Sequence, residues 1–302
     1  MQKGFTLLEI LVSISITLVL GAAVFQLFQQ NERVFSDQNL VTEMQQAARA
    51  GIFQAADEIR MAGQGVPIYA QSYGEAPSEE TVVILSGSSS TRINLRVSLS
   101  PAESFVTLPR PVALTVGNTS TVTVDDATGL YDAVGGGPAG RFVYFWGDSS
   151  TTGWQWSRAL IRSIAPSSRN VNVTAVSSGP AGVAGGAVQY PDAPAISLEE
   201  AVALFYDNST GSVRRTTATN MTDPVHPVWS PANELVSNVR LLHFDYFDHF
   251  GNSINPDSLT ERVSVASVEI RLAVQTAQDL RNKSRPVFAL SVRTNIRSSR
   301  IH

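Results

Sequence analysis

The sequence predicts an α+β protein in which one long amino-terminal helix packs on an antiparallel, β-rich head. Two observations carry this prediction. Residues 5–28 form an almost unbroken apolar run, and an amphipathic stretch follows it over residues 29–65. From residue 66 to residue 302 the composition turns to Val, Thr, Ser and Gly in short alternating runs, a pattern typical of strands. We therefore expect a membrane-spanning helix, an amphipathic stalk helix and a globular head, in that order.

Composition excludes several classes of function. The chain has 302 residues, of which 43% are hydrophobic, so it can bury a substantial core. Its net charge is −4 and its Lys and Arg residues are scattered, which speaks against a nucleic-acid partner because such proteins present a basic surface. There is no cysteine, hence no disulfide or thiolate chemistry. We find no metalloprotease, nucleophile-elbow or phosphate-loop motif, and therefore expect no cofactor and no enzymatic activity.

The apolar run is long enough to cross a membrane. About 20 apolar residues in a helix span the hydrocarbon core of a bilayer. Lys3 precedes the run, which favours a cytoplasmic amino terminus and an exported head. Glu9 is the one charge within the run. A carboxylate inside a bilayer costs about 2.5–3.5 kcal/mol on insertion scales, so Glu9 either lies among the headgroups or has a charged partner.

The first nine residues, MQKGFTLLE, resemble the class III signal of type IV pilins and pseudopilins. In that motif a short basic leader ends in Gly, and Phe, Thr, Leu and Glu follow at fixed spacing before the apolar helix. The resemblance implies that residues 1–4 are a leader, that a prepilin peptidase cuts after Gly4, and that the new amino terminus at Phe5 is N-methylated. It also implies that Glu9 pairs with the amino-terminal amine of a neighbouring subunit.

The amphipathic stretch continues the helix. No Pro interrupts it, and Gly63, Gly65 and Pro67 supply a stop signal. We expect one apolar stripe on this half of the helix, to be covered by a sheet. The stripe consists of Val34, Val41, Met44, Ala48, Ile52, Ala55 and Ile59.

The head is expected to consist of antiparallel strands with no helical pattern between them. A hairpin over residues 201–216 turns at Asp207–Gly211. Residues 109–191 look like an inserted β-module. The strands expected are Thr81–Ser86, Arg92–Ser98, Val112–Val116, Thr121–Val124, Arg141–Trp146, Ala159–Ile164, Asn170–Val176, Ala201–Tyr206, Ser212–Thr216, Val239–Phe247, Arg262–Gln275 and Pro286–Ile296.

Several short motifs of the head are similar to the W or J type of minor pilins and pseudopilins. The similarity is carried by IRMAG at residues 59–63, FYD at residues 205–207, FDYFD at residues 244–248 and VEIRL at residues 268–272. It implies a structural subunit that primes or caps a type IV pilus or a type II secretion pseudopilus. Alternatives are a tip adhesin, a DNA-uptake pilin, or the major pilin of the shaft.

The implied partners follow from the same resemblance. They are other pilin or pseudopilin subunits, the prepilin peptidase, an inner-membrane assembly platform, and membrane lipid before assembly. The chain would be a single-pass protein of the inner membrane with its head outside the cytoplasm, and later part of a periplasmic or extracellular filament.

Two weaker candidate sites remain in the head. Asp245, Asp248 and Asn252 offer oxygen ligands of the kind that Ca²⁺ prefers, although a polar strand edge and a turn explain them equally well. An aromatic group around a Gly, Ser and Thr loop could form an adhesive surface, although strand cores have the same composition. That group consists of Tyr144, Phe145, Trp146, Trp154 and Trp156.

Overall fold

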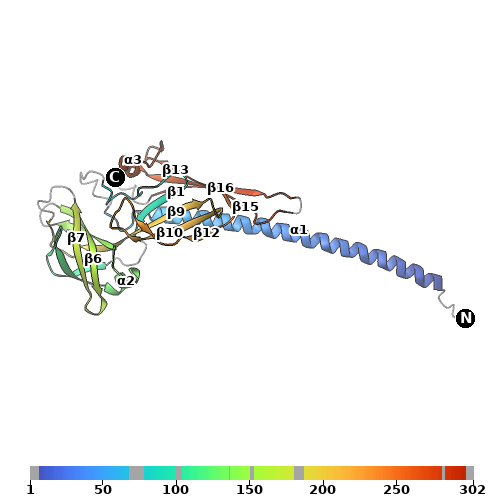
Figure 1. Cartoon of the computed structure of the whole chain (residues 1–302), viewed down its shortest axis with the longest axis horizontal. Coiled ribbons are helices and arrows are strands. Elements are labelled where there is room, and N and C mark those ends of the chain that lie inside the picture. The colour runs from blue at the N-terminus through green and yellow to red at the C-terminus, as the bar shows by residue number, and fades with distance from the viewer. Residues whose placement is uncertain are drawn as a thin grey trace.

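The structure, a computed structural model, describes residues 7–67, 78–98, 104–135, 137–149, 153–179, 187–280 and 283–296. A single helix, α1 (Leu7–Met61), carries a β-rich head around its carboxyl-terminal end, and its amino-terminal half extends away from the head (Figure 1). The head is built from antiparallel strand pairs. The predicted α+β fold class is confirmed.

The helix ends where the sequence predicted. Beyond Met61 the backbone N–H of Gly63 donates to the carbonyl oxygen of Arg96, which ties the chain to the first strand of the head. Gly65 has φ +69°, and a Cβ there would lie 2.7 Å from Cβ of Ser98, so the turn requires glycine. One face of α1 is buried from Met44 onward. Val34 of the predicted stripe is 45% exposed, because the head begins to cover the helix only after that position.

A four-stranded sheet packs on the carboxyl-terminal half of α1. It contains β13 (Val239–Phe247), β14 (Ser253–Ile254), β15 (Ser267–Gln275) and β16 (Val287–Asn295), in the order β14-β13-β15-β16. The predicted alternation of β15 is confirmed. Its apolar face, which is Val268, Ile270, Leu272 and Val274, lies in one hydrophobic cluster with Ile52 and Ile59 of α1.

A second group of strands completes this core. These are β1 (Arg92–Val97), β9 (Ala195–Asp207), β10 (Ser212–Asn220), β11 (Val228–Trp229) and β12 (Asn233–Val236). The predicted hairpin is the β9–β10 pair, in which Asp207 lies opposite Ser212. We call the covered half of α1 together with both groups of strands the stalk lobe.

The remaining strands form a closed barrel. Each strand of the barrel pairs with the next, and the last pairs back with the first. The order is β2 (Ser104–Leu108), β4 (Thr119–Val124), β7 (Asn170–Gly179), β6 (Gly153–Ala165), β5 (Phe142–Ser149) and the first part of β9. A separate hydrophobic cluster fills it, with members between Val106 and Leu198. The barrel lies at the end of the molecule opposite the amino terminus (Figure 1).

Smaller elements complete the barrel region. Strands β3 (Val112–Thr115) and β8 (Ala187–Tyr190) pair with each other and contribute Leu114 and Tyr190 to the barrel core. Helix α2 (Ala127–Ala133) and the 3-10 turn η2 (Pro166–Ser168) lie between strands. The predicted module at residues 109–191 falls within this region, and its standing as a separate domain stays a prediction.

The structure corrects three expectations for the head. Short helices do occur between strands, namely α2 and α3 (Leu259–Ser264). The strand expected to begin at Arg262 begins at Ser267, because Ser258 and Glu261 form a capping box that starts α3 instead. Thr81–Ser86 is not a strand. Its backbone turns at Ser78–Val82, and Ile84 makes only an isolated bridge to Leu95.

Candidate assembly helix and buried junction

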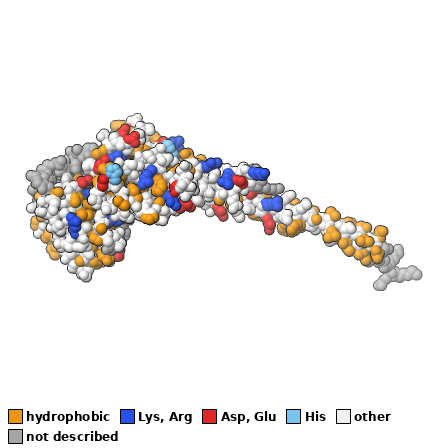
Figure 2. All heavy atoms as spheres, viewed as in Figure 1, with side chains coloured by type: hydrophobic (Ala, Val, Ile, Leu, Met, Phe, Trp, Pro, Cys, Tyr) orange, Lys and Arg blue, Asp and Glu red, His pale blue; other side chains and the backbone are white. Residues whose placement is uncertain are grey.

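The amino-terminal half of α1 presents an apolar surface. Every residue from Leu7 to Ser36 is exposed. The large hydrophobic side chains between Leu7 and Phe28 are 50–78% exposed. Figure 2 shows these hydrophobic side chains covering the projecting part of the helix, with charged side chains beginning nearer the head. By length and composition this helix can cross a membrane. Such a surface is stable only against lipid or against other apolar helices.

Two hydroxyl side chains in this half are satisfied within the helix. The Ser15 hydroxyl donates to the carbonyl oxygen of Leu11 at 2.9 Å, and the Thr17 hydroxyl donates to that of Ser13 at 2.8 Å. A hydroxyl that bonds back to the preceding turn leaves no donor directed outward. These two hydroxyl groups can therefore lie in hydrocarbon or between packed helices without losing a hydrogen-bond partner.

Glu9 lies in the first turn of α1, among exposed apolar side chains. A carboxylate near a helix amino terminus is favoured by the helix dipole, which offsets part of the cost of placing it in an apolar setting. Gly4 and Phe5, the predicted cleavage and methylation positions, lie outside the described residues. The predicted pairing of Glu9 with a neighbouring amino terminus therefore stays a prediction.

The possible metal ligands of the head have other partners. Asp245 lies on β13, with Oδ2 2.7 Å from Nη2 of Arg271 and Oδ1 3.2 Å from Nε2 of His243. Asp248 closes a turn in which it accepts hydrogen bonds from the backbone N–H of Phe250 and from Asn252. The Asn252 side chain is the main cause that lowers the pKa of Asp248.

These partners favour the simpler interpretation of the three residues as an ion pair and a turn. Within the described ranges, no group of three or more His, Cys, Asp or Glu side chains is placed to hold a metal ion. Ligation by Asp245, Asp248 and Asn252 stays a prediction.

The aromatic group proposed as an adhesive surface is mainly core. Tyr144, Phe145 and Trp156 are almost completely buried, and Trp146 and Trp154 are partly buried. Tyr144 and Trp156 pack edge to face, with ring centroids 6.2 Å apart. The expectation that these side chains are exposed was wrong. Phe145 belongs to the barrel core, and the other four pack with Val66 in a separate hydrophobic cluster.

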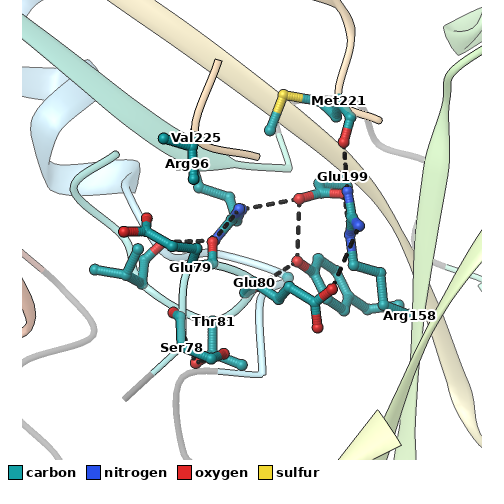
Figure 3. A network of polar contacts seen from close by, with 12 residues as sticks. Ser78, Glu79, Glu80, Thr81, Arg96, Arg158, Glu199, Met221 and Val225 are labelled. Carbon is teal, nitrogen blue, oxygen red and sulfur yellow. Dashed lines mark hydrogen bonds and ion pairs between the residues drawn. The ribbon is translucent and has the colours of Figure 1, made fainter. Parts of the chain in front are cut away.

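Sequence reasoning missed a buried charged network where the barrel meets the stalk lobe (Figure 3). Glu199 of β9 lies at its centre, and its side chain is fully buried. One carboxylate oxygen, Oε1, is 2.9 Å from Nε of Arg96, and the other, Oε2, accepts a hydrogen bond of 2.8 Å from Nε of Arg158. The side chains of Arg96 and Arg158 are 0% and 3% exposed. The available signal was weak: Arg96 and Arg158 are charges within strands, but Glu199 is followed by a second glutamate.

The network continues beyond these three residues. The Tyr144 hydroxyl is 3.1 Å from Oε1 of Glu199, and Glu80 lies 3.8 Å from Nη1 of Arg158. Burial lowers the pKa of the Arg158 guanidinium, but the interactions with Glu199, Tyr144 and Glu80 together outweigh this effect, so the net pKa is raised. Burial also raises the pKa of Tyr144. Both shifts favour the protonated forms of these two side chains.

The exposed apolar helix joined to a β-rich head is consistent with a protein anchored in a membrane by its amino-terminal helix. Residues 1–25 match the family model described as the prokaryotic N-terminal methylation motif. This match supports the type IV pilin and pseudopilin superfamily, as the first nine residues predicted. No curated protein and no solved structure shows a significant match to the chain.

Proposed function

We propose that the chain is a minor pilin or pseudopilin of the W or J type, a structural subunit that primes or caps a type IV pilus or a type II secretion pseudopilus. The observation that carries the proposal is the exposed apolar half of α1 bearing Glu9 in its first turn. Before assembly this helix spans the inner membrane once, with the head outside the cytoplasm. In the filament it packs among the helices of other subunits.

Maturation and docking follow from the amino terminus. Prepilin peptidase cuts after Gly4, and methylation of Phe5 leaves a positively charged amine on the helix. Glu9 of one subunit pairs with that amine of the next, which sets the axial register. Removing one member of a buried charge pair leaves the other charge without a partner, which destabilises the assembly by about 3–5 kcal/mol. An assembly platform in the inner membrane supplies the energy for extraction.

The size of the head supports a position at a filament end. The barrel adds a second hydrophobic core beyond the one that covers α1. It also lies at the end of the molecule remote from the amino terminus (Figure 1). A subunit at the tip has space for such a lobe, whereas a shaft subunit must fit it between neighbours at every repeat.

Mass spectrometry of the amino terminus tests the proposal, on sheared filaments and on membranes from the same cells. We expect N-methylated Phe5 in the filament fraction at low abundance, and loss of the Glu9→Ala variant from that fraction. Glu32→Ala is the matched control, because Glu32 is an exposed carboxylate on the same helix beyond the apolar run. An amino terminus that remains Met1, in a chain confined to the membrane, would contradict the proposal. High abundance in filaments would indicate a major pilin.

A second candidate is a tip subunit that binds an external surface. The outer face of the barrel favours it, because short uncharged polar side chains are hydrogen-bonded there across β4 and β7. These pairs are Thr119–Thr174, Thr121–Asn172 and Thr123–Asn170. Binding of the soluble head to uncharged glycans, compared with DNA over a range of salt concentrations, separates an adhesin from a DNA-uptake pilin. If the head binds neither glycans nor DNA, the structural role is the one that the results support.

A further inference from the structure

The strand β9 belongs to both lobes, and it changes partners at one peptide bond. Glu199 lies opposite Phe142 of β5 in the barrel, whereas Glu200 lies opposite Val97 of β1 in the stalk lobe. The side chain of Glu199 therefore sits at the point where the barrel ends and the stalk lobe begins. A charged side chain is least expected at such a buried position.

The two oxygens of Glu199 engage different lobes. Oε1 is 2.9 Å from Nε of Arg96, which lies on β1 of the stalk lobe. Oε2 accepts its hydrogen bond from Nε of Arg158, which lies on β6 of the barrel. One carboxylate thus links the lobes through one ion pair and one charge-assisted hydrogen bond, drawn as dashed lines in Figure 3.

Each arginine is also held by carbonyl oxygens on its far side. Arg96 donates from Nη1 to Val82 at 2.7 Å and from Nη2 to Glu79 at 2.8 Å. Arg158 donates from Nη2 to Met221 at 2.6 Å, and because Met221 follows β10 this bond also joins the barrel to the stalk lobe. Each guanidinium therefore has a fixed position before Glu199 is considered, and Glu199 fits between the two. Because hydrogen bonds have preferred directions, this arrangement constrains angle as well as distance.

Other contacts also join the lobes. The backbone N–H of Met221, next to β10, donates to the carbonyl oxygen of Gly140 at 3.0 Å, and Nη1 of Arg141 donates to that of Ala218 at 3.2 Å. A small apolar cluster brings Phe142 of the barrel against Leu85, Ala201 and Ala218. Apolar contacts of this kind keep the lobes together and tolerate sliding, because the hydrophobic effect has no preferred direction. The contacts of Glu199 differ from these because they join charges that are almost completely buried.

We propose that Glu199 is a positioning residue that fixes the direction of the barrel relative to α1. With Arg96 and Arg158 it makes the two lobes one rigid body. Without its charge, two buried guanidinium groups lose their shared partner and favour arrangements that expose them to water. The barrel then swings on β9 while each hydrophobic core stays folded. This inference concerns the head and does not depend on the proposed function.

Spin-label distance measurements test the proposal on the full chain in detergent micelles. The chain has no cysteine, so a label pair is introduced cleanly by Gln46→Cys on α1 and Ser167→Cys on the barrel, two exposed positions. We expect one narrow distance distribution for this background. Adding Glu199→Gln should give a distribution about twofold broader, or split, because the two buried guanidinium groups lose the carboxylate that they share.

The control is Glu200→Gln, the next residue on the same strand, which is partly exposed and lies 3.7 Å from Arg141. Its distribution should remain narrow. An unchanged narrow distribution in Glu199→Gln, with near-ultraviolet circular dichroism showing a folded barrel, overturns the proposal. If Glu199→Gln unfolds the barrel, Arg96→Met decides the question, because it removes only the stalk-side guanidinium. A folded barrel with a broad distribution then supports the proposal, and a narrow one overturns it.

Discussion

Gly51 of α1 marks the closest approach between the helix and the head, and replacing it by Ala should destabilise the stalk lobe. A Cβ at this position would lie 2.0 Å from Cγ2 of Val236 on β12. Two carbon atoms in van der Waals contact need about 3.5–4.0 Å, so the helix and β12 must separate by about 1.5 Å. Val236 cannot easily turn aside, because β-branched side chains have few rotamers.

The change in the free energy of unfolding caused by Gly51→Ala follows from two opposing effects. Overpacking a core costs about 1–3 kcal/mol, and a separation of this size belongs near the upper end of that range. Alanine is favoured over glycine within a helix by about 0.8–1.0 kcal/mol. We therefore expect Gly51→Ala to lower the free energy of unfolding by about 1–2 kcal/mol. Urea unfolding of the full chain in detergent micelles, followed by far-ultraviolet circular dichroism, measures this change.

Two further variants make the test decisive. Gly21→Ala is the control, because a Cβ there meets no described atom within 4 Å, and it should leave the stability of the head unchanged. Val236→Ala removes the clashing methyl group, so the double variant should be no less stable than Val236→Ala alone. A gain of about 1 kcal/mol in Gly51→Ala would refute the reasoning, because it would show that only helix propensity responds.

Three other variants probe the pH dependence and the local structure of the head. Burial raises the pKa of Glu58, so as pH rises from about 4 the unfolded chain ionises first and the free energy of unfolding falls. Glu58→Gln should abolish that fall when urea unfolding at about pH 4 and pH 7 is compared. Ser258→Ala removes the cap of α3 and should cost about 1 kcal/mol in urea unfolding, whereas Thr260→Ala, on the exposed side of the same helix, should cost little. Tyr190→Phe removes a buried hydroxyl 3.2 Å from that of Ser157 and should lower barrel stability by about 1 kcal/mol. The half-exposed Tyr131→Phe is its control, and equal losses for both tyrosines would contradict the assignment.

The parts of the fold that depend on local pattern could be predicted from the sequence. The apolar run, the glycines after α1 and the alternation of β15 each report on their own neighbourhood in the chain. The stop of α1 and the β9–β10 hairpin were predicted for the same reason. In contrast, Thr81–Ser86 has the residues of a strand but finds only one bridging partner, which no local pattern reveals.

The barrel and the buried network could not be predicted, because both arise from long-range pairing. Closure requires β9 to pair with β2 and β5, whose positions in space follow only from the completed fold. Glu199 is followed by a second glutamate, and a pair of charges in a strand normally indicates a solvated face. Only the structure shows that one of the two points into the junction.

The register of β1 and β9 gives the barrel a particular place in the chain. Val97 and Glu200 are direct neighbours across an antiparallel pair, so the chain leaves the stalk lobe and returns to it at adjacent positions. The barrel strands thus lie in the part of the chain where a hairpin would have its loop. Because its entry and exit points are adjacent, a segment of this kind can be enlarged or shortened without displacing the strands of the stalk lobe that pack on α1. Each strand of the closed ring also has two partners within the ring, so enlargement adds no free edge for neighbouring chains to pair with. The shape of the outer lobe can therefore diversify while the surface that builds the polymer stays constant.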